Sequence, residues 1–107
     1  MNESDIVNLS AGLEYQNQSV ISRVLLKNAG GTITLFAFDE GEGLSEHKTP
    51  YDAFVTIVEG SVRIRIADHV HSLSAGDSLV LPADIPHAVD AMTKFKMLLV
   101  MIKAPKE

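Results

Sequence analysis

The chain has 107 residues, a formal net charge of −5 and no cysteine, so it has room for one domain and offers neither a disulfide framework nor a thiolate nucleophile. Hydrophobic residues make up 46% of the chain and aromatic residues only 6%, which predicts an aliphatic core. The acidic balance argues against a nucleic-acid surface, and no apolar run approaches the roughly 20 residues of a membrane span. Because the first residues are acidic and lack the apolar stretch of a signal peptide, we expect a cytoplasmic protein.

In chain order, a polar segment comes first and short apolar segments follow it. We expect residues 1–19 to form an irregular arm, with at most a short strand that docks on a neighbour. The later segments are rich in Val, Ile and Leu, are bounded by Gly, Pro, Asn or Asp, and recur about every ten residues, as in all-β sandwiches and barrels. The strands expected are 20–27, 32–39, 51–59, 62–66, 70–73, 78–81, 87–91 and 95–103, with a loop at 40–45.

Two stretches place a histidine beside a strand end. In the first, five residues separate Gly41 from His47, and an apolar strand then runs to Gly60. In the second, Gly76 leads through a short strand to Pro82 and then to His87. Alternation along an extended chain puts His47 and Thr49 on the same side. Taken alone, each histidine is either a solvated residue or a member of a site, and the residues by themselves do not decide between the two.

With these spacings the chain resembles the cupins. Their first motif runs from glycine through His-x-His and glutamate to glycine, and their second runs from glycine through proline and histidine to asparagine. The match covers about residues 32–102. The resemblance implies an all-β double-stranded β-helix, the cupin jelly-roll barrel, as a single domain of residues 1–107 with 1–19 as its N-terminal arm. It also implies a site in the mouth of the barrel.

Typical cupins bind a divalent metal through three histidines and a glutamate, and the resemblance therefore implies metal ligands here. His47 and His87 match two of them. Thr49 stands in place of the second histidine, Ala53 in place of the glutamate and Ala91 in place of the asparagine. We therefore expect at most a weak site for a divalent transition metal (Zn, Ni, Mn or Fe) on His47 and His87, since a tight site has three or more protein ligands.

Other residues offer further alternatives for the site. Asp52 lies next to the glutamate position but on the opposite strand face, so it reaches the site only if a bulge follows Pro50. Glu42 could reach in from the loop. His69 and His71 have a chelating spacing, but a solvated hairpin turn explains them better. Met101 is expected to form part of the core or the pocket wall, and we count it with His47, Thr49 and His87 as a ligand-binding residue.

Three hypotheses of function follow. The first is a small-molecule binding protein, in which an apolar pocket carries a few polar anchors. The second is a metal-dependent enzyme of the dioxygenase, isomerase or decarboxylase type, with His47 and His87 as ligands. The third is a barrel used only for association. We favour the first hypothesis.

Strand parity also predicts a homodimer. Only one face of each strand lines the barrel, so the other face would expose the apolar residues Phe54, Val58, Leu98, Val100 and Ile102 in a monomer. A stable interface of about 800 Å² per partner would cover such a patch.

Overall fold

A computed structural model describes residues 5–105, which form nine strands and no helix. No helix in this part of the chain is therefore long and apolar enough to cross a membrane. The strands are β1 (Val20–Asn28), β2 (Gly31–Phe38), β3 (Gly43–His47), β4 (Tyr51–Glu59), β5 (Ser61–Ile66), β6 (His69–Ser74), β7 (Ser78–Leu81), β8 (His87–Ala91) and β9 (Phe95–Lys103).

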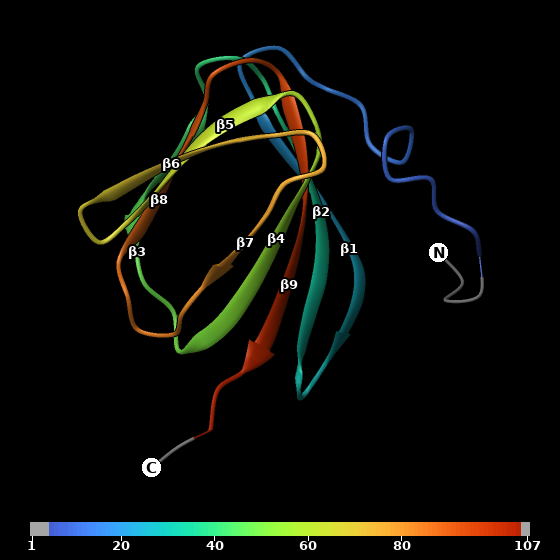
Figure 1. Ribbon diagram of the computed structural model, residues 1–107. Coiled ribbons are helices and arrows are strands. Elements are labelled where there is room, and N and C mark those ends of the chain that lie inside the picture. Colours follow the sequence, from blue (N-terminus) through green and yellow to red (C-terminus); the bar gives the residue numbers. More distant parts are fainter. Residues whose placement is uncertain (1–4, 106–107) are drawn as a thin grey trace.

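The strands form two antiparallel sheets that face each other (Figure 1). The larger sheet has the order β1-β2-β9-β4-β7 and the smaller one the order β3-β8-β5-β6. Short turns join the paired strands β1–β2 and β5–β6, whereas the other pairs bring together strands that are distant in the sequence, as in a double-stranded β-helix. The predicted all-β jelly roll is thus confirmed, and β9, which follows every other strand in the sequence, lies in the middle of the larger sheet.

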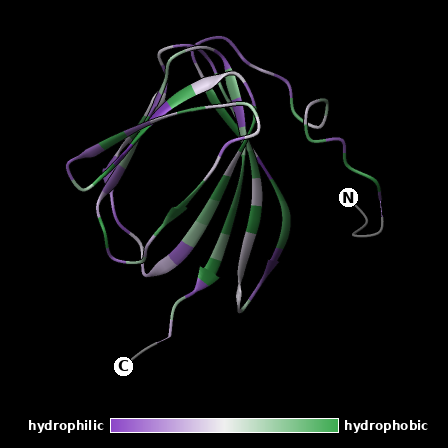
Figure 2. Cartoon of the chain, viewed as in Figure 1, coloured by the Kyte–Doolittle hydropathy of each residue, from purple (hydrophilic) through white to green (hydrophobic). Residues whose placement is uncertain are grey.

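The core lies between the two sheets because side chains alternate across each strand. Figure 2 shows apolar residues concentrated along the strands of both sheets. The largest fully buried side chains include Phe38, Ile57, Ile64 and Phe95. The rings of Phe38 on β2 and Phe95 on β9 stack with their centroids 4.5 Å apart. Because the register pairs these two residues directly, the stack ties the two neighbouring strands together at the centre of the core.

Strand structure forms in two places where the sequence predicted a loop or a turn. Residues 40–45 were expected to be loop, but β3 begins at Gly43, which pairs with Asp90 of β8. The expected turn residue His69 is already the first residue of β6, opposite Ile66. In both places the partner strand supplies the hydrogen bonds, so strand structure forms where local propensity alone does not favour it.

The N-terminal arm, described from residue 5 to residue 19, contains no strand and packs on its own chain. The Nζ of Lys96 on β9 donates to the carbonyl of Ser10, and the hydroxyl of Tyr15 donates to Glu59 at 2.6 Å. Lys96 also lies over the Tyr15 ring, with Nζ 4.8 Å from the centroid. Burial, followed by the bond to Glu59, raises the pKa of Tyr15 above its ordinary range. These contacts hold the arm on the outer face of the larger sheet. Residues 1–4 of the predicted arm lie outside the described residues.

Candidate functional site

A small pocket opens between the two sheets at the end of the barrel where β3 and β8 meet. Its wall is mostly apolar. The pocket encloses about 50 Å³ of solvent space, enough for a few water molecules. All four residues predicted as ligand-binding lie in this wall: His47, Thr49, His87 and Met101. The rest of the lining is Leu44, Ala53, Val55, Leu81, Val89, Met97 and Leu99.

The two histidines are direct cross-strand neighbours, His47 on β3 and His87 on β8. Their ring centroids are 4.3 Å apart and the rings meet edge to face at 65°. His47 Nδ1 lies 2.7 Å from the carbonyl oxygen of Ser45, and His87 Nδ1 lies 3.3 Å from that of Ile85. A carbonyl oxygen only accepts, so each Nδ1 carries the proton. The neutral rings therefore keep their Nε2 lone pairs for a bound group.

The two rings differ in their surroundings. His87 is 6% exposed, whereas His47 is exposed at the mouth of the pocket. Burial lowers the pKa of His87, the bond to Ile85 opposes that shift, and the neighbouring His47 lowers the pKa further. The lowered pKa favours the uncharged form of the buried His87 ring near neutral pH.

Thr49 is the third polar group of the pocket. Its Oγ1 accepts a hydrogen bond from the backbone N–H of Tyr51 at 2.9 Å, which leaves the hydroxyl proton free to donate. Ala53 is buried in the same wall, and it adds no donor or acceptor from its side chain. The pocket thus offers two imidazole acceptors and one hydroxyl donor within an apolar lining.

The carboxylates that the sequence left as alternatives do not reach the pocket. Asp52 is exposed, and its side chain accepts a hydrogen bond from the N–H of Ala83 at 2.9 Å. The bulge that would have turned it inward is absent, since β4 pairs in regular register from Tyr51 to Ile57. Glu42 pairs through its main chain with Ala91 and is not part of the lining. His69 and His71 are exposed on the β5–β6 hairpin, as expected of a solvated turn.

The donor set of the pocket falls short of the metal site that the family resemblance implies. Within residues 5–105 there is no group of three or more His, Cys, Asp or Glu side chains placed to hold a metal ion. Two imidazole nitrogens leave most of the coordination shell of a divalent ion to water. The residues present therefore do not fit a tight metal centre.

Sequence reasoning missed the groups that orient the two imidazoles, because these are main-chain carbonyls, of Ser45 and Ile85. Every residue has such a carbonyl, so no letter in the sequence marks them. In both cases the carbonyl belongs to the residue two positions before the histidine.

Comparison with known proteins assigns the chain to a family. The pattern of the family described as "Cupin domain" matches residues 34–103. No curated protein matches the chain significantly. Among solved structures, a conserved protein of unknown function from Streptococcus pyogenes is 32% identical with a TM-score of 0.91, and the match covers 99% of this chain and 93% of that one. A cupin superfamily protein from Desulfitobacterium hafniense is 29% identical with a TM-score of 0.88, covering 97% and 94% of the two chains. A cupin 2 conserved barrel domain protein from Leptotrichia buccalis is 38% identical with a TM-score of 0.87, over 90% of this chain and 47% of its own length. By sequence pattern, fold and identity alike, this chain belongs to the cupin family.

Proposed function

We propose that the protein binds a small molecule with an apolar body and a polar end, and that His47, His87 and Thr49 hold the polar end. The observation that supports this most is the shared orientation of the two imidazoles. Both Nδ1–H groups are committed to backbone carbonyls, so both Nε2 atoms are acceptors in an otherwise apolar wall. Such a wall with a few convergent polar groups is the usual composition of a small-molecule site.

The geometry favours a ligand end that both donates and accepts. The two Nε2 atoms accept, and the hydroxyl of Thr49 donates. A primary amide or an undissociated carboxylic acid has this combination. A carboxylate has only acceptors, so it binds well only when one of the two imidazoles is protonated, and burial disfavours that state at His87.

The size of the pocket limits what enters it. A typical pocket for a drug-sized ligand holds about 300–1,000 Å³, whereas this one has about 50 Å³ of solvent space. Only a small group fits inside, and the rest of a larger ligand would lie at the mouth beside His47. For a divalent metal we propose no more than weak binding, since two protein nitrogens are available to it.

The proposal is tested with butanamide and butanoate as probes, by NMR of the imidazole carbon-bound protons. Butanamide at pH 7.5 should shift the His47 and His87 signals in the wild type. His87→Ala should abolish that effect. His71→Ala, which removes an exposed histidine outside the pocket, should leave it unchanged. Butanoate should bind more weakly than butanamide at pH 7.5 and gain affinity as the pH is lowered, because a protonated imidazole donates to a carboxylate. The proposal is wrong if neither probe shifts the two signals, or if His87→Ala binds as well as the wild type.

A further inference from the structure

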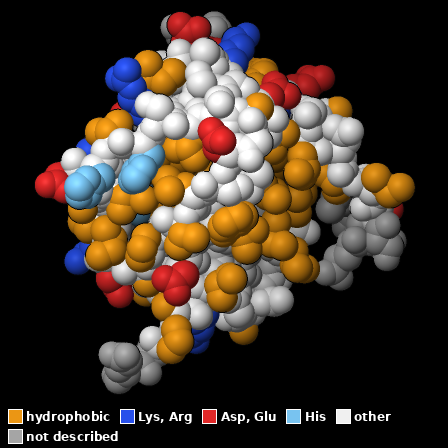
Figure 3. Space-filling view, in the orientation of Figure 1, with side chains coloured by type: hydrophobic (Ala, Val, Ile, Leu, Met, Phe, Trp, Pro, Cys, Tyr) orange, Lys and Arg blue, Asp and Glu red, His pale blue; other side chains and the backbone are white. Residues whose placement is uncertain are grey.

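The outer face of the larger sheet carries a row of apolar side chains that crosses all of its strands. The register places Leu26 of β1, Ile33 of β2, Val100 of β9, Phe54 of β4 and Val80 of β7 side by side in that order. Leu26, Phe54 and Val80 are 40%, 44% and 55% exposed. In Figure 3 apolar side chains form a broad band over the region where β4, β9 and β2 lie in Figure 1.

The smaller sheet shows what a solvated outer face looks like in this protein. Its outward positions include Arg63, Arg65, Ser72 and Asp90, and Arg65 donates to Glu46 at 2.7 Å. An antiparallel sheet with one face in water normally alternates in this way, with polar residues outside. The larger sheet departs from that pattern along the whole row, so its outer face is suited to contact with another surface.

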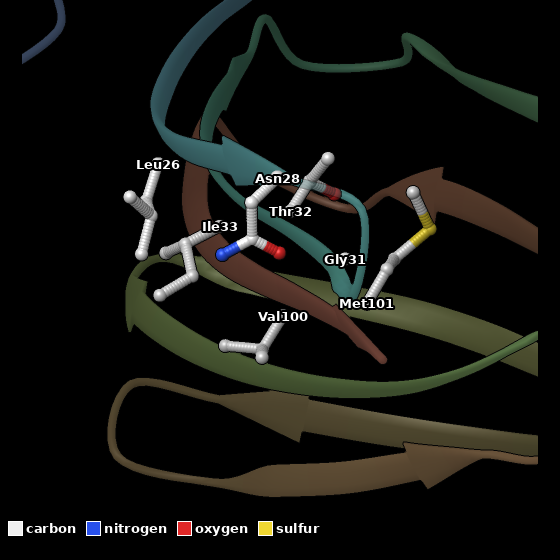
Figure 4. Close-up of a pocket in the computed structure, with 7 residues that line it drawn as sticks. All are labelled: Leu26, Asn28, Gly31, Thr32, Ile33, Val100 and Met101. Carbon is white, nitrogen blue, oxygen red and sulfur yellow. The ribbon is translucent and has the colours of Figure 1, made fainter. Parts of the chain in front are cut away.

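The row is uneven, with a hollow on one side of β9 and a projection on the other. The hollow lies between Leu26, Ile33 and Val100, holds about 120 Å³, and has Asn28 at its edge. Figure 4 shows that these four side chains project to one side, whereas Thr32 and Met101 point to the other. The projection is the ring of Phe54, directly across β9 from the hollow, because Val100 pairs with Ile33 on one side and with Phe54 on the other.

We propose that this face binds a second copy of the same chain, about a two-fold axis that runs along β9. Because β9 is the middle of five strands, such an axis lays β2 of one copy over β4 of the other, and β1 over β7. Phe54 of each copy then meets the hollow of the other, and Val100 meets Val100. A two-fold contact needs this kind of self-complementary surface.

The next row along the strands fits the same axis. Asn28, Gly31, Ile102 and Asp52 follow one another across the sheet, so Asp52 of one copy faces Gly31 of the other and lies one strand away from that copy's Asn28. The side-chain oxygen of Asn28 already accepts a hydrogen bond from the backbone N–H of Gly30 at 2.7 Å, which leaves the side-chain NH₂ group to donate. Asp52 uses one oxygen on Ala83 and has a second to accept. The usual crossing of stacked sheets by about 30° keeps this match near the centre of the face and loosens it at the edges.

The area predicts the strength of the contact. The row through Val100 and the row through Ile102 together have a flat area of roughly 300 Å², because strands lie about 4.8 Å apart and rise about 3.4 Å per residue. This is within the range of functional apolar patches but below the roughly 800 Å² per partner of a standard interface. The arm borders the patch, since Gly12 lies against Leu35 of the same face, and it adds its flank to the contact. We therefore expect a dimer that dissociates in the micromolar range.

The absence of cysteine from the wild-type chain allows a direct test. Stacked sheets lie about 10 Å apart, too far for a disulfide, so single cysteines are joined with a short bis-maleimide. Val100→Cys should cross-link with itself, and a mixture of Phe54→Cys with Ile33→Cys should cross-link more than either variant alone. Val70→Cys is the matched control, because Val70 is 61% exposed on the outer face of the smaller sheet.

Sedimentation equilibrium supplies the second measurement. The wild type should pass from one-chain to two-chain mass across the micromolar range, and Phe54→Asp should raise the dissociation constant about 30-fold or more, as for a central aromatic residue of an interface. The proposal is overturned by a one-chain mass at every concentration, by cross-linking of Val70→Cys as efficient as that of Val100→Cys, or by self-cross-linking of Phe54→Cys exceeding that of the mixture, which would place the axis across the strands.

Discussion

Replacing Thr49 by His and Ala53 by Glu should convert the two-histidine pocket into a site with four protein ligands. Both positions line the pocket together with His47 and His87. The substitutions restore the residue types that the family motif has there, so the variant tests whether the motif positions have the geometry of a cupin metal site. The wild type should gain little from zinc, because it offers two nitrogens only.

The expected change in the unfolding free energy of the variant has two parts, one without metal and one with zinc. Without metal the variant should be less stable by about 3 kcal/mol, since Ala53 is 5% exposed and a carboxyl group there loses water. Thr49→His also removes the hydroxyl that accepts from Tyr51 N–H, a loss of about 1 kcal/mol within that total. With zinc at about 100 times its dissociation constant, binding to the folded state adds about 2.7 kcal/mol, or roughly 10–20 °C in Tm.

The assay is thermal unfolding of the wild type and the variant, in zinc and in a chelator. A variant with Thr49→Asn and Ala53→Gln is the control, because it has similar size but no added metal ligand of comparable strength. Zinc should raise the Tm of the His/Glu variant back to near that of the wild type and leave the control unchanged. If zinc moves the Tm of the His/Glu variant no more than that of the control, the alignment of Thr49 and Ala53 with the family ligands is wrong.

Three further outcomes are expected. Burial holds the pKa of His87 below its ordinary value of 6.5, so the unfolded chain takes up a proton that the folded one resists. Stability in urea should therefore fall as the pH drops below about 6.5, and fall less in His87→Gln; an equal fall in both would contradict this. Tyr15→Phe, which removes a bond from the arm to a carboxylate on β4, should lower the unfolding free energy by about 1 kcal/mol, and no change would mean that the arm is not held there. Gly60→Ala should cost at least about 2 kcal/mol more than Gly41→Ala in chemical denaturation, because both have positive φ but only at Gly60 would a Cβ meet a backbone oxygen, that of Lys94 at 2.1 Å; similar losses would refute the steric argument.

Most of the strands were predictable because their signal is local. Segments such as Tyr51–Glu59 and Phe95–Lys103 are long, apolar and β-branched, and the structure has them at the expected bounds. The start of β3 was not predictable, since Gly43 is a poor strand former and becomes strand through its pairing with Asp90. A distant partner decides such a position, and the letters nearby do not name that partner.

The candidate site likewise has features that the sequence predicted and features that it did not. Alternation put His47 and Thr49 on one side of the chain, and both line the pocket. The motif spacing predicted that His87 belongs to the same site, and the centroid of its ring lies 4.3 Å from that of His47. The buried state of His87 and the small volume of the pocket depend on packing between two sheets, which spacing does not describe. The contact of Lys96 with the arm spans 86 residues and had no sequence signal.

The position of β9 at the centre of the larger sheet sets the order in which that sheet can assemble. Its neighbours β2 and β4 come much earlier in the chain. The edge of each strand that faces β9 has no pairing partner until β9 is present. A ribosome therefore releases two strands whose facing edges stay open while the following residues are made. Open strand edges are templates for pairing with other chains. Nascent chains are thus exposed to mispairing until Phe95–Lys103 has left the ribosome and β9 pairs with both open edges.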